Sequence, residues 1–378
     1  MSPRLQVALI SSGLGRELRG IETWMADLAA HLPDSVSAKL WGGGSFVSPR
    51  PDRPSQRIWG ISRNHRLLRS KSWSDRYYAE QHSALPGALL RLILQRPDVA
   101  YCGDPALSWN LKRFRKWHRS SVVFLNGMRL TPVWCASFDG VHVLAPPYIE
   151  EAARLLPGQS IDQFFSVPHF TDVERFHPAS IEERRAARRQ FGIAEDAFVV
   201  LCIGPLGTAS GKRVDHVAEE LARGSSRALL VSAGADEQGA SEVRGRITQA
   251  LGPRALLLGR VERSRMADLH RAADVFALGT LGEPFSIAIA EALASGVPVV
   301  HHQDPITNWV AGVGGAAVSM STQGEAADAF RRLETDAAWR SSLGAAGRKL
   351  AVERYAPGPV CAALEREWRR IALRTSSR

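Results

Sequence analysis

The stretch Asp274–Val300 reads DVFALGTLGEPFSIAIAEALASGVPVV, and it decides the fold. Its first apolar run ends at Leu278, and a glycine-containing loop follows. Apolar positions then have helical spacing over Ile287–Ala294, ahead of Ser295-Gly296 and a second β-rich run, Pro298–Val300. A strand, a helix and a further strand in this order predict a parallel sheet with a crossover helix.

The same alternation extends in both directions along the 378 residues, a length that itself favours two domains. A helix is expected over Ile21–Leu32 and another over Val360–Leu373. The expected strands are Leu5–Ile10, Val36–Trp41, Asp98–Cys102, Val122–Leu125, Val141–Leu144, Phe198–Ile203, Ala228–Ser232, Ala255–Leu258, Val275–Leu278 and Pro298–Val300. The proline-bracketed segment Val167–Pro178 is typical of a linker. The fold class is therefore α/β, with two Rossmann-like, doubly wound domains at 1–168 and 169–358.

The loop and helix of the opening stretch predict a diphosphate site. Ser286 is expected to cap the helix, so that backbone N–H groups of Phe285, Ser286 and Ile287 point outward from a positive helix end. Glu283 lies ahead of the helix and Glu291 lies one turn inside it. A carboxylate on either side of a diphosphate accepts hydrogen bonds from sugar hydroxyls. The pattern indicates a nucleotide-sugar donor.

Residues 283–298, EPFSIAIAEALASGVP, resemble the signature of retaining glycosyltransferases of family 4, a GT-B family. The resemblance implies two Rossmann-like domains that face a cleft, with the acceptor on the first and the donor on the second. It implies that the last helix, 359–378, crosses back to the first domain. It also implies that Glu283 holds hydroxyls of the transferred sugar, that Glu291 holds the ribose, and that transfer retains the anomeric configuration.

Two further segments of the second domain are similar to this family. Arg260 and Val261 follow a predicted strand where the family contacts the nucleobase through its backbone. Lys212 keeps the place of a catalytic lysine that faces the diphosphate, and Arg213 is a second candidate cation. Pro205, however, stands where the family usually has an arginine, which puts the catalytic rate in doubt.

The N-terminal glycine loop resembles the family's loop in which a glycine lets the backbone approach the donor diphosphate. Gly20 takes this place, with Arg19 instead of a second common glycine. Leu18 at the third glycine position excludes a dinucleotide fingerprint. The family's N-domain histidine has no obvious counterpart, and the acceptor-side candidates in its place are His82, Tyr101, Asp104 and Asn126.

Several function classes lack their motifs. The chain has no Asp-x-Asp for a metal, and its four cysteines form no Cys-x-x-Cys pair. We expect no metal and no cofactor, since the nucleotide sugar is a substrate. A hexose-type donor sugar is expected, with UDP slightly favoured over GDP. The alternative is a catalytically weak or inactive relative that only binds nucleotide sugar. No nucleic-acid-binding module is recognisable.

Charge is concentrated in the first half, where residues 1–170 hold 21 Lys+Arg and 13 Asp+Glu, or +8 of the total +10. Residues 50–76 carry eight basic side chains against Asp52 and Asp75. This segment predicts an anionic acceptor or a peripheral contact with an anionic membrane, the alternative being a solvated surface without a specific role. The N-terminus lacks a signal-peptide pattern, and no apolar run approaches the about 20 residues of a membrane span, so the expected location is the cytoplasm.

Overall fold

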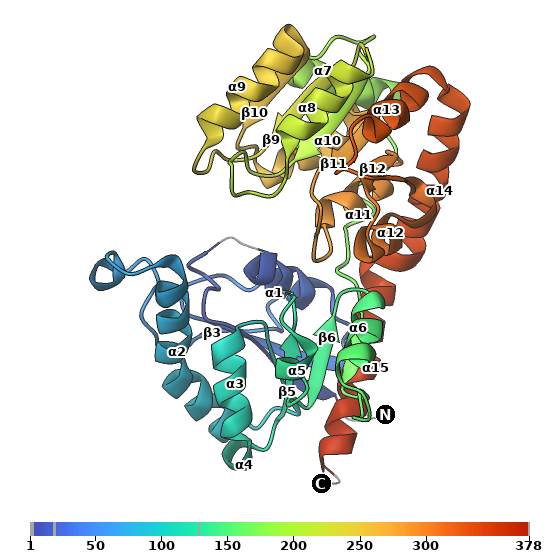
Figure 1. Ribbon diagram of the computed structural model, residues 1–378. Coiled ribbons are helices and arrows are strands. Elements are labelled where there is room, and N and C mark those ends of the chain that lie inside the picture. Colours follow the sequence, from blue (N-terminus) through green and yellow to red (C-terminus); the bar gives the residue numbers. More distant parts are fainter. Residues whose placement is uncertain (1–3, 18–19, 128, 377–378) are drawn as a thin grey trace. The chain divides into compact units, whose positions relative to one another are not determined.

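The computed structural model describes residues 4–17, 20–127 and 129–376, which form two compact units (Figure 1). Unit 1 contains residues up to His169 together with the C-terminal segment from Pro357, and unit 2 contains Phe170–Ala356. Each unit is built on one parallel sheet. Parallel strands are joined by crossover helices, as the alternating sequence pattern predicts. The predicted fold class of two Rossmann-like domains is confirmed.

Unit 1 has a seven-stranded sheet in the order β3-β2-β1-β4-β5-β6-β7. Its strands are β1 (Leu5–Ser11), β2 (Val36–Gly42), β3 (Ser55–Arg57), β4 (Val99–Cys102), β5 (Ser121–Leu125), β6 (Gly140–Val143) and β7 (Phe164–Ser166). Its helices are α1 (Gly20–His31), η1 (Arg66–Leu68), α2 (Trp73–Gln95), α3 (Pro105–Arg113), α4 (Arg115–His118), α5 (Pro132–Cys135), α6 (Pro147–Leu155) and α15 (Pro357–Ser376).

The C-terminal helix α15 packs in unit 1, as expected from the family resemblance. Its residues Leu364, Trp368 and Ile371 are fully buried. The Trp368 ring lies 5.1 Å from that of Tyr101 in β4, and the Tyr101 hydroxyl accepts a 3.1 Å hydrogen bond from Trp24 Nε1 of α1. Helices from the two ends of the chain therefore meet on the central strand of this sheet.

Unit 2 has a six-stranded sheet in the order β10-β9-β8-β11-β12-β13. Its strands are β8 (Val199–Ile203), β9 (Leu229–Ala233), β10 (Ala255–Gly259), β11 (Val275–Leu278), β12 (Val299–His302) and β13 (Gly315–Val318). Its helices are α7 (Ile181–Gln190), α8 (Val214–Arg223), α9 (Ala240–Leu251), η2 (Gly252–Arg254), η3 (Arg263–Arg265), α10 (Met266–Ala272), α11 (Ile287–Ala294), α12 (Pro305–Ala311), η4 (Gly312–Gly314), α13 (Glu325–Thr335) and α14 (Ala337–Tyr355).

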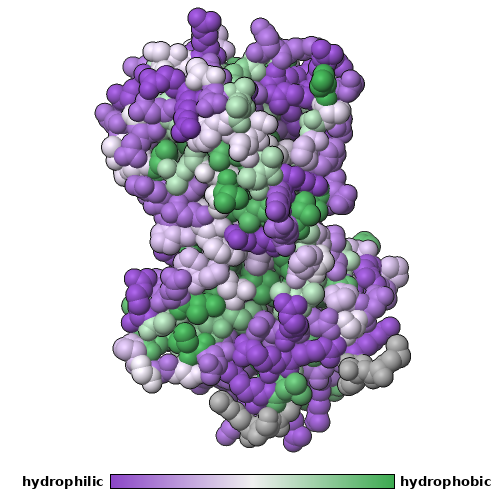
Figure 2. All heavy atoms as spheres, turned by 90° about the vertical axis from the view of Figure 1, so that its right-hand side faces the viewer, coloured by the Kyte–Doolittle hydropathy of each residue, from purple (hydrophilic) through white to green (hydrophobic). Residues whose placement is uncertain are grey.

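Apolar side chains that alternate along the unit 2 strands and recur on the helix faces form its core, among them Val200, Leu230, Val275 and Phe330. This core fixes the strands, so the loops at their ends carry the functional groups. Figure 2 shows the surface seen from the right-hand side of Figure 1. That side is mostly hydrophilic, with hydrophobic patches on each unit.

Candidate functional site

The strand order of unit 2 creates a switch point between β8 and β11. From β8 the chain continues to β9 and β10 on one side, whereas β11 leads to β12 and β13 on the other. The loops that follow β8 and β11 therefore diverge, and ligands of open α/β sheets bind in such a crevice at the carboxyl ends of the strands. Lys212 lies in the first of these loops and Glu283 in the second.

Lys212 and Glu283 are bonded to each other across this switch point. Lys212 Nζ lies 2.9 Å from Oε2 and 3.0 Å from Oε1 of the glutamate. The two side chains are 22% and 15% exposed, so solvent still reaches the pair. A partly exposed pair contributes little to stability, but this contact holds an ammonium and a carboxylate together at the sheet edge. The two residues are far apart in the sequence, and the adjacency of β8 and β11 in the sheet brings them together.

Glycine follows each of the three central strands and brings backbone close to this edge. The residues are Gly204 after β8, Gly234 after β9 and Gly279 after β11. A Cβ on Gly234 would lie 1.8 Å from the Gly204 carbonyl oxygen, and one on Gly279 would lie 2.6 Å from the Arg213 carbonyl oxygen. Side chains are excluded from both positions, which leaves the floor of the crevice to backbone groups.

Arg213 binds its own chain rather than pointing freely from the edge. Its Nη1 donates to the carbonyl oxygens of Met320, at 2.8 Å, and Gly279, at 3.3 Å. Its backbone is left-handed, with φ of +49°. The guanidinium therefore joins the loops that follow β11 and β13. Lys212, by contrast, has its only side-chain bonds among the described residues with Glu283, a group that a diphosphate can displace.

The helix α11 begins at Ile287, as predicted, but the prediction that Ser286 caps it is wrong. Ser286 has φ of +65° and its side chain makes no capping hydrogen bond. A capping serine needs an extended backbone to aim its hydroxyl at the first turn, and a left-handed residue cannot do so. Phe285 is 3% exposed, and its ring meets that of Tyr355 edge-on at 5.8 Å. Phe285 thus anchors the loop through its side chain.

Glu291 projects from α11 beside a buried histidine that the sequence pattern did not single out. Its Oε2 lies 3.7 Å from Nε2 of His270 in α10, and its side chain is 19% exposed. The His270 ring is fully buried and packs edge-on against Phe176 at 5.6 Å. A histidine under the carboxylate can orient it. Nothing in the spacing of residues 270 and 291 predicts this contact.

Arg260 and Val261 directly follow β10 at the same edge of the sheet. Arg260 is exposed and Val261 is half-buried, and the preceding Gly259 turns the chain with φ of +65°. Strand β9 lies between them and the loop of Lys212. The structure therefore places the expected base-binding residues along the same edge but two strands away from the lysine.

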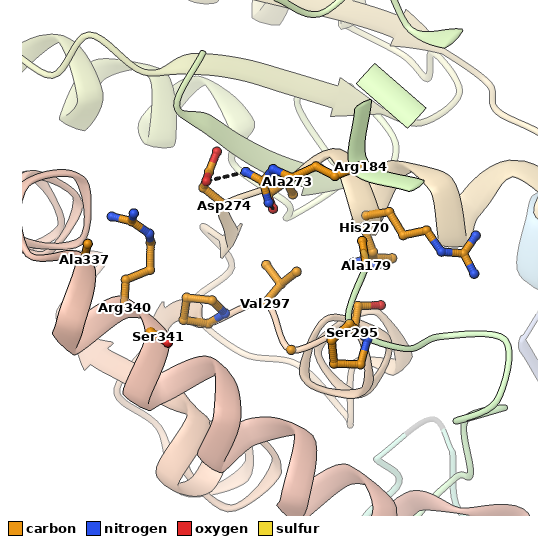
Figure 3. A pocket seen from close by; sticks show the side chains of 14 residues that line it. Ala179, Arg184, His270, Ala273, Asp274, Ser295, Val297, Ala337, Arg340 and Ser341 are labelled. Carbon is orange, nitrogen blue, oxygen red and sulfur yellow. Dashed lines mark hydrogen bonds and ion pairs between the residues drawn. The ribbon is translucent and has the colours of Figure 1, made fainter. Parts of the chain in front are cut away.

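Pocket geometry marks a different part of unit 2, at the opposite ends of β11 and β12. The pocket holds about 240 Å³ and is lined by residues that include Arg184, His270, Asp274, Ser295 and Arg340 (Figure 3). Asp274 accepts hydrogen bonds from Arg184, drawn as a dashed line, and from Arg188. Asp274 and Pro298 precede their strands, so this pocket lies at the amino-terminal edge and is separate from Lys212 and Glu283.

The corresponding switch point of unit 1 lies between β1 and β4. Gly20 opens α1 there, is exposed, and has nothing within 4 Å of where a Cβ would stand. Nothing within unit 1 thus requires a glycine at this position. Leu18 and Arg19 lie outside the described residues.

Asp104 follows β4 and is 1% exposed. One carboxyl oxygen, Oδ2, accepts the backbone N–H of Ser12 after β1, while Oδ1 has no hydrogen-bond partner among the described residues. Burial raises the pKa of Asp104 to about 6, although its hydrogen bonds to Ser12 oppose the shift. A buried carboxyl with one unpartnered oxygen is the strongest proton-transfer candidate at this edge.

The other acceptor-side candidates differ in accessibility. Tyr101 is fully buried, and its hydroxyl lies 2.7 Å from His142 Nδ1 inside the core. Asn126 braces the next loop, because its side chain bonds both backbone groups of Leu130 at 2.8 and 2.9 Å. His82 is exposed on α2 and lines a pocket. Of these three side chains, His82 is the one open to a ligand.

Fewer basic side chains of residues 50–76 are exposed and unpaired than the sequence suggests. Arg63 is 3% exposed and bonded to Glu80, and Arg53 is 1% exposed and bonded to carbonyl oxygens that include that of Ala29. Arg50 pairs with Asp34 and Asp52. The prediction that Arg63 belongs to a solvent-facing patch is therefore wrong, because the side chain neutralises a buried carboxylate. The exposed basic residues of this segment are Arg57, Arg66, Arg69 and Lys71.

Comparison with known proteins agrees with this geometry. Residues 197–336 match the family model described as glycosyl transferases group 1. A D-inositol 3-phosphate glycosyltransferase of Xylanimonas cellulosilytica is 31% identical over 176 residues, 44% of this chain and 40% of the relative. Residues 197–336 are thus similar to the group 1 glycosyltransferases. The matched segment contains Lys212, Glu283 and Glu291.

Two further comparisons extend this result. A GDP-mannose-dependent monoacylated alpha-(1-6)-phosphatidylinositol monomannoside mannosyltransferase of Corynebacterium glutamicum is 30% identical over 198 residues, 49% of this chain and 50% of the relative. The chain thus spans half or less of the length of these two relatives. The structure of Anabaena HepE in complex with UDP and glucose has 16% identity and a TM-score of 0.74, and covers 96% of this chain and 98% of its own. This likeness identifies the fold as GT-B.

Two features are absent from the described residues. No described helix combines the length and apolar character needed to cross a membrane. Within the same part of the chain, no group of three or more His, Cys, Asp or Glu side chains is arranged to hold a metal ion.

Proposed function

We propose that this chain is a retaining glycosyltransferase that moves a hexose-type sugar from a nucleotide-sugar donor bound at the carboxyl edge of the unit 2 sheet. The observation that carries the proposal is the bond between Lys212 and Glu283 at the β8–β11 switch point. A cation for a diphosphate and a carboxylate for sugar hydroxyls belong together in a donor site. Neither group needs the other for stability at a partly exposed position.

In the proposed reaction each residue acts on a separate part of the donor. Glu283 releases Lys212 to the diphosphate and accepts hydrogen bonds from the transferred sugar, while Glu291 accepts them from the ribose. The bond from the anomeric carbon to the β-phosphate oxygen breaks and a bond to the acceptor oxygen forms on the same face. The acceptor proton passes to the leaving diphosphate. Lys212 stabilises the negative charge that develops there.

The proposed donor contains UDP in preference to GDP, although the relatives point both ways. The solved HepE structure contains UDP, whereas the Corynebacterium relative is named for GDP-mannose. We propose that no metal or cofactor takes part, because Lys212 and the positive end of α11 supply the charge at the diphosphate. The acceptor is proposed to be anionic, to match the exposed arginines and lysine ahead of α2.

A second candidate is a relative that binds nucleotide sugar and transfers it slowly or not at all. Pro205 favours it, since this position lacks the cation that the family usually offers, and Arg213 is engaged by backbone carbonyls. Calorimetry with UDP-, GDP- and dTDP-sugars tests donor binding for both candidates. Slow donor hydrolysis then separates them, because a pure binder releases no nucleotide.

The stereochemistry of the same hydrolysis tests retention. The first anomer released from an α-linked donor is read by proton NMR before mutarotation. An α-sugar is expected from a retaining enzyme. A β-sugar, or the absence of binding by any nucleotide sugar, would contradict the proposal.

A further inference from the structure

Residues of α2, of α3 and of the segment around α5 in unit 1 line a pocket of about 490 Å³ that the donor chemistry leaves unused. Tyr78 and His82 line it from α2, Trp109 and Asn110 from α3, and Leu130 and Trp134 from the segment around the start of α5. A volume between 300 and 1,000 Å³ is typical of small-molecule sites. The pocket belongs to a single unit, so its geometry stands without any interdomain contact.

Aromatic rings dominate the wall. The rings of Trp109 and Trp134 stack with centroids 5.7 Å apart at an interplanar angle of 26°. Tyr78 is 43% exposed and Trp109 is 37% exposed. Aromatic side chains normally bury most of their surface, so rings left open around one cavity favour a ligand that covers them.

The pocket lining offers no charged side chain to pair with a charged ligand group. None of the described lining residues is Asp, Glu, Lys or Arg. Besides the hydroxyls of Tyr78 and Thr131, the polar side chains are His82 and Asn110. Asn110 Nδ2 donates to the Ala106 carbonyl oxygen at 2.7 Å and lies 3.5 Å from His82 Nδ1. A free sugar carries a hydroxyl on nearly every carbon and would leave most of them without partners here. The inserted group is therefore mainly apolar, with His82, Asn110 and the hydroxyls of Tyr78 and Thr131 available for a small number of polar atoms.

The pocket borders the reactive edge of its own sheet. Pro105, which lines it, directly follows Asp104, the buried carboxyl at the β1–β4 switch point. A group seated in the pocket therefore lies beside the carboxyl end of β4, where ligands of such sheets bind.

Positive charge lies next to the pocket along α2. The exposed Arg66, Arg69 and Lys71 precede this helix, and Trp73 stacks on Tyr77 at 5.1 Å, one residue before Tyr78. Tyr78 lies five residues inside α2, about 7.5 Å along its axis from Trp73, and Lys71 precedes Trp73 by two residues. Leu67 among them is 75% exposed.

We propose that this pocket is an acceptor subsite for the apolar group of an anionic amphiphile, whose charge is bound by Arg66, Arg69 and Lys71. The inference rests on the proposed transferase function, but its binding step does not need catalysis. It assigns the acceptor to molecules that combine an acyl, isoprenoid or aromatic group with a phosphate or carboxylate.

The probe is dodecyl phosphate below its micellar concentration, titrated into the full chain and followed by tryptophan fluorescence and calorimetry. Dodecyl maltoside tests the need for charge. The double variant Tyr78→Ser/Trp109→Ser is compared with Trp117→Ser, an indole that is 61% exposed on α4 and does not line the pocket. Circular dichroism and UDP-sugar calorimetry on each variant confirm the fold and the donor site.

We expect at least a tenfold rise in the dissociation constant of dodecyl phosphate for the double variant and no change for Trp117→Ser, with weaker binding of dodecyl maltoside. Equal affinity of the double variant and the parent, or no binding by the parent, would overturn the assignment. Co-sedimentation with phosphatidylglycerol vesicles that depends on Trp109 identifies a membrane source, and dodecyl phosphate binding without co-sedimentation identifies a soluble amphiphile. Failure of nucleotide-sugar binding, by contrast, would contradict the transferase function alone.

Discussion

Lys212 and Glu283 are 71 residues apart in the chain, yet their ammonium and carboxylate atoms lie 2.9 and 3.0 Å apart. They meet because the carboxyl ends of adjacent parallel strands, β8 and β11, lie side by side. Without a donor, the glutamate holds the lysine at the sheet edge. In the proposed reaction a diphosphate would replace one anionic partner of Lys212 by another, with the cation positioned before the donor arrives.

The pair itself is open to a double-mutant cycle with Lys212→Met and Glu283→Gln. Because both side chains are partly exposed, we expect a coupling free energy of about 0.5–1 kcal/mol in urea unfolding without nucleotide. The coupling should fall when 1 M salt screens the charges. Additive effects of the two substitutions at low salt would show that the pair does not form in solution.

The two glutamates should separate binding from transfer. Glu291→Gln is expected to weaken nucleotide binding by about 1.5–3 kcal/mol, since it loses a charge-assisted bond to the ribose. Glu283→Gln should mainly lower the transfer or donor-hydrolysis rate. Calorimetry with the free nucleotide and rates with the nucleotide sugar distinguish the effects, and the exposed Glu353→Gln on α14 serves as control. If both variants keep full affinity and full rate, the donor lies elsewhere.

Much of this site follows from sequence, because a buried parallel strand and its crossover helix leave a regular apolar pattern. Helix α11 and the glutamates on either side of its start were predicted in this way. The missed strands β3, β7 and β13 have three or four residues and all lie at sheet edges, where the apolar run is too short to stand out.

Contacts between distant segments were not predictable. The backbone twist at Ser286, the burial of Arg63 against Glu80 and the wall formed by Tyr78, Trp109 and Trp134 each depend on three-dimensional neighbours. Local spacing contains no signal for them. The same holds for His270 beneath Glu291.

Asp104→Asn should change the pH dependence of stability. The native carboxyl, with a pKa of about 6, keeps its proton to higher pH than the unfolded chain, whose pKa is near 3.8. The contribution of Asp104 to the stability of the parent therefore falls as pH rises from about 4 to about 6 and is constant beyond, whereas asparagine carries no such penalty. The asparagine carbonyl can still accept the Ser12 N–H.

Urea unfolding at pH 4 and pH 7 measures this effect. Between pH 4 and pH 7, the free energy of unfolding of the variant should rise relative to that of the parent by up to roughly 3 kcal/mol, the free-energy equivalent of the pKa difference. Asp328→Asn, at a side chain that is 71% exposed, is the control and should show no comparable gain. A parallel pH dependence of parent and Asp104→Asn would mean that the carboxyl is not perturbed.

Activity should survive EDTA at a concentration high enough to remove all divalent cations. The expectation rests on Lys212 and the α11 N-terminus at the diphosphate, in place of a metal ion. Donor hydrolysis before and after chelation, with magnesium or manganese restored afterwards, is the measurement. An activity that disappears with EDTA and returns with either metal would refute metal-independence.

Neutralising the exposed part of the basic segment should release the protein from anionic surfaces. The triple variant Arg66→Gln/Arg69→Gln/Lys71→Gln removes three charges, and each charge near an anionic membrane contributes about 1 kcal/mol of attraction. Co-sedimentation with phosphatidylglycerol vesicles should therefore weaken by roughly 100-fold in affinity, and the difference from the parent should shrink as salt rises. Arg63 is left intact, because it is one of the two arginines, with Arg16, that neutralise the buried carboxylate of Glu80.

The matched control removes three exposed arginines from other surfaces, Arg227, Arg331 and Arg366. Both variants have the same net charge, so a difference between them reports the position of the charges and not their number. If vesicle binding falls equally in the two variants, the segment acts only through the net charge of the protein. Binding that falls only in the first variant places the anionic partner beside the N-terminal end of α2.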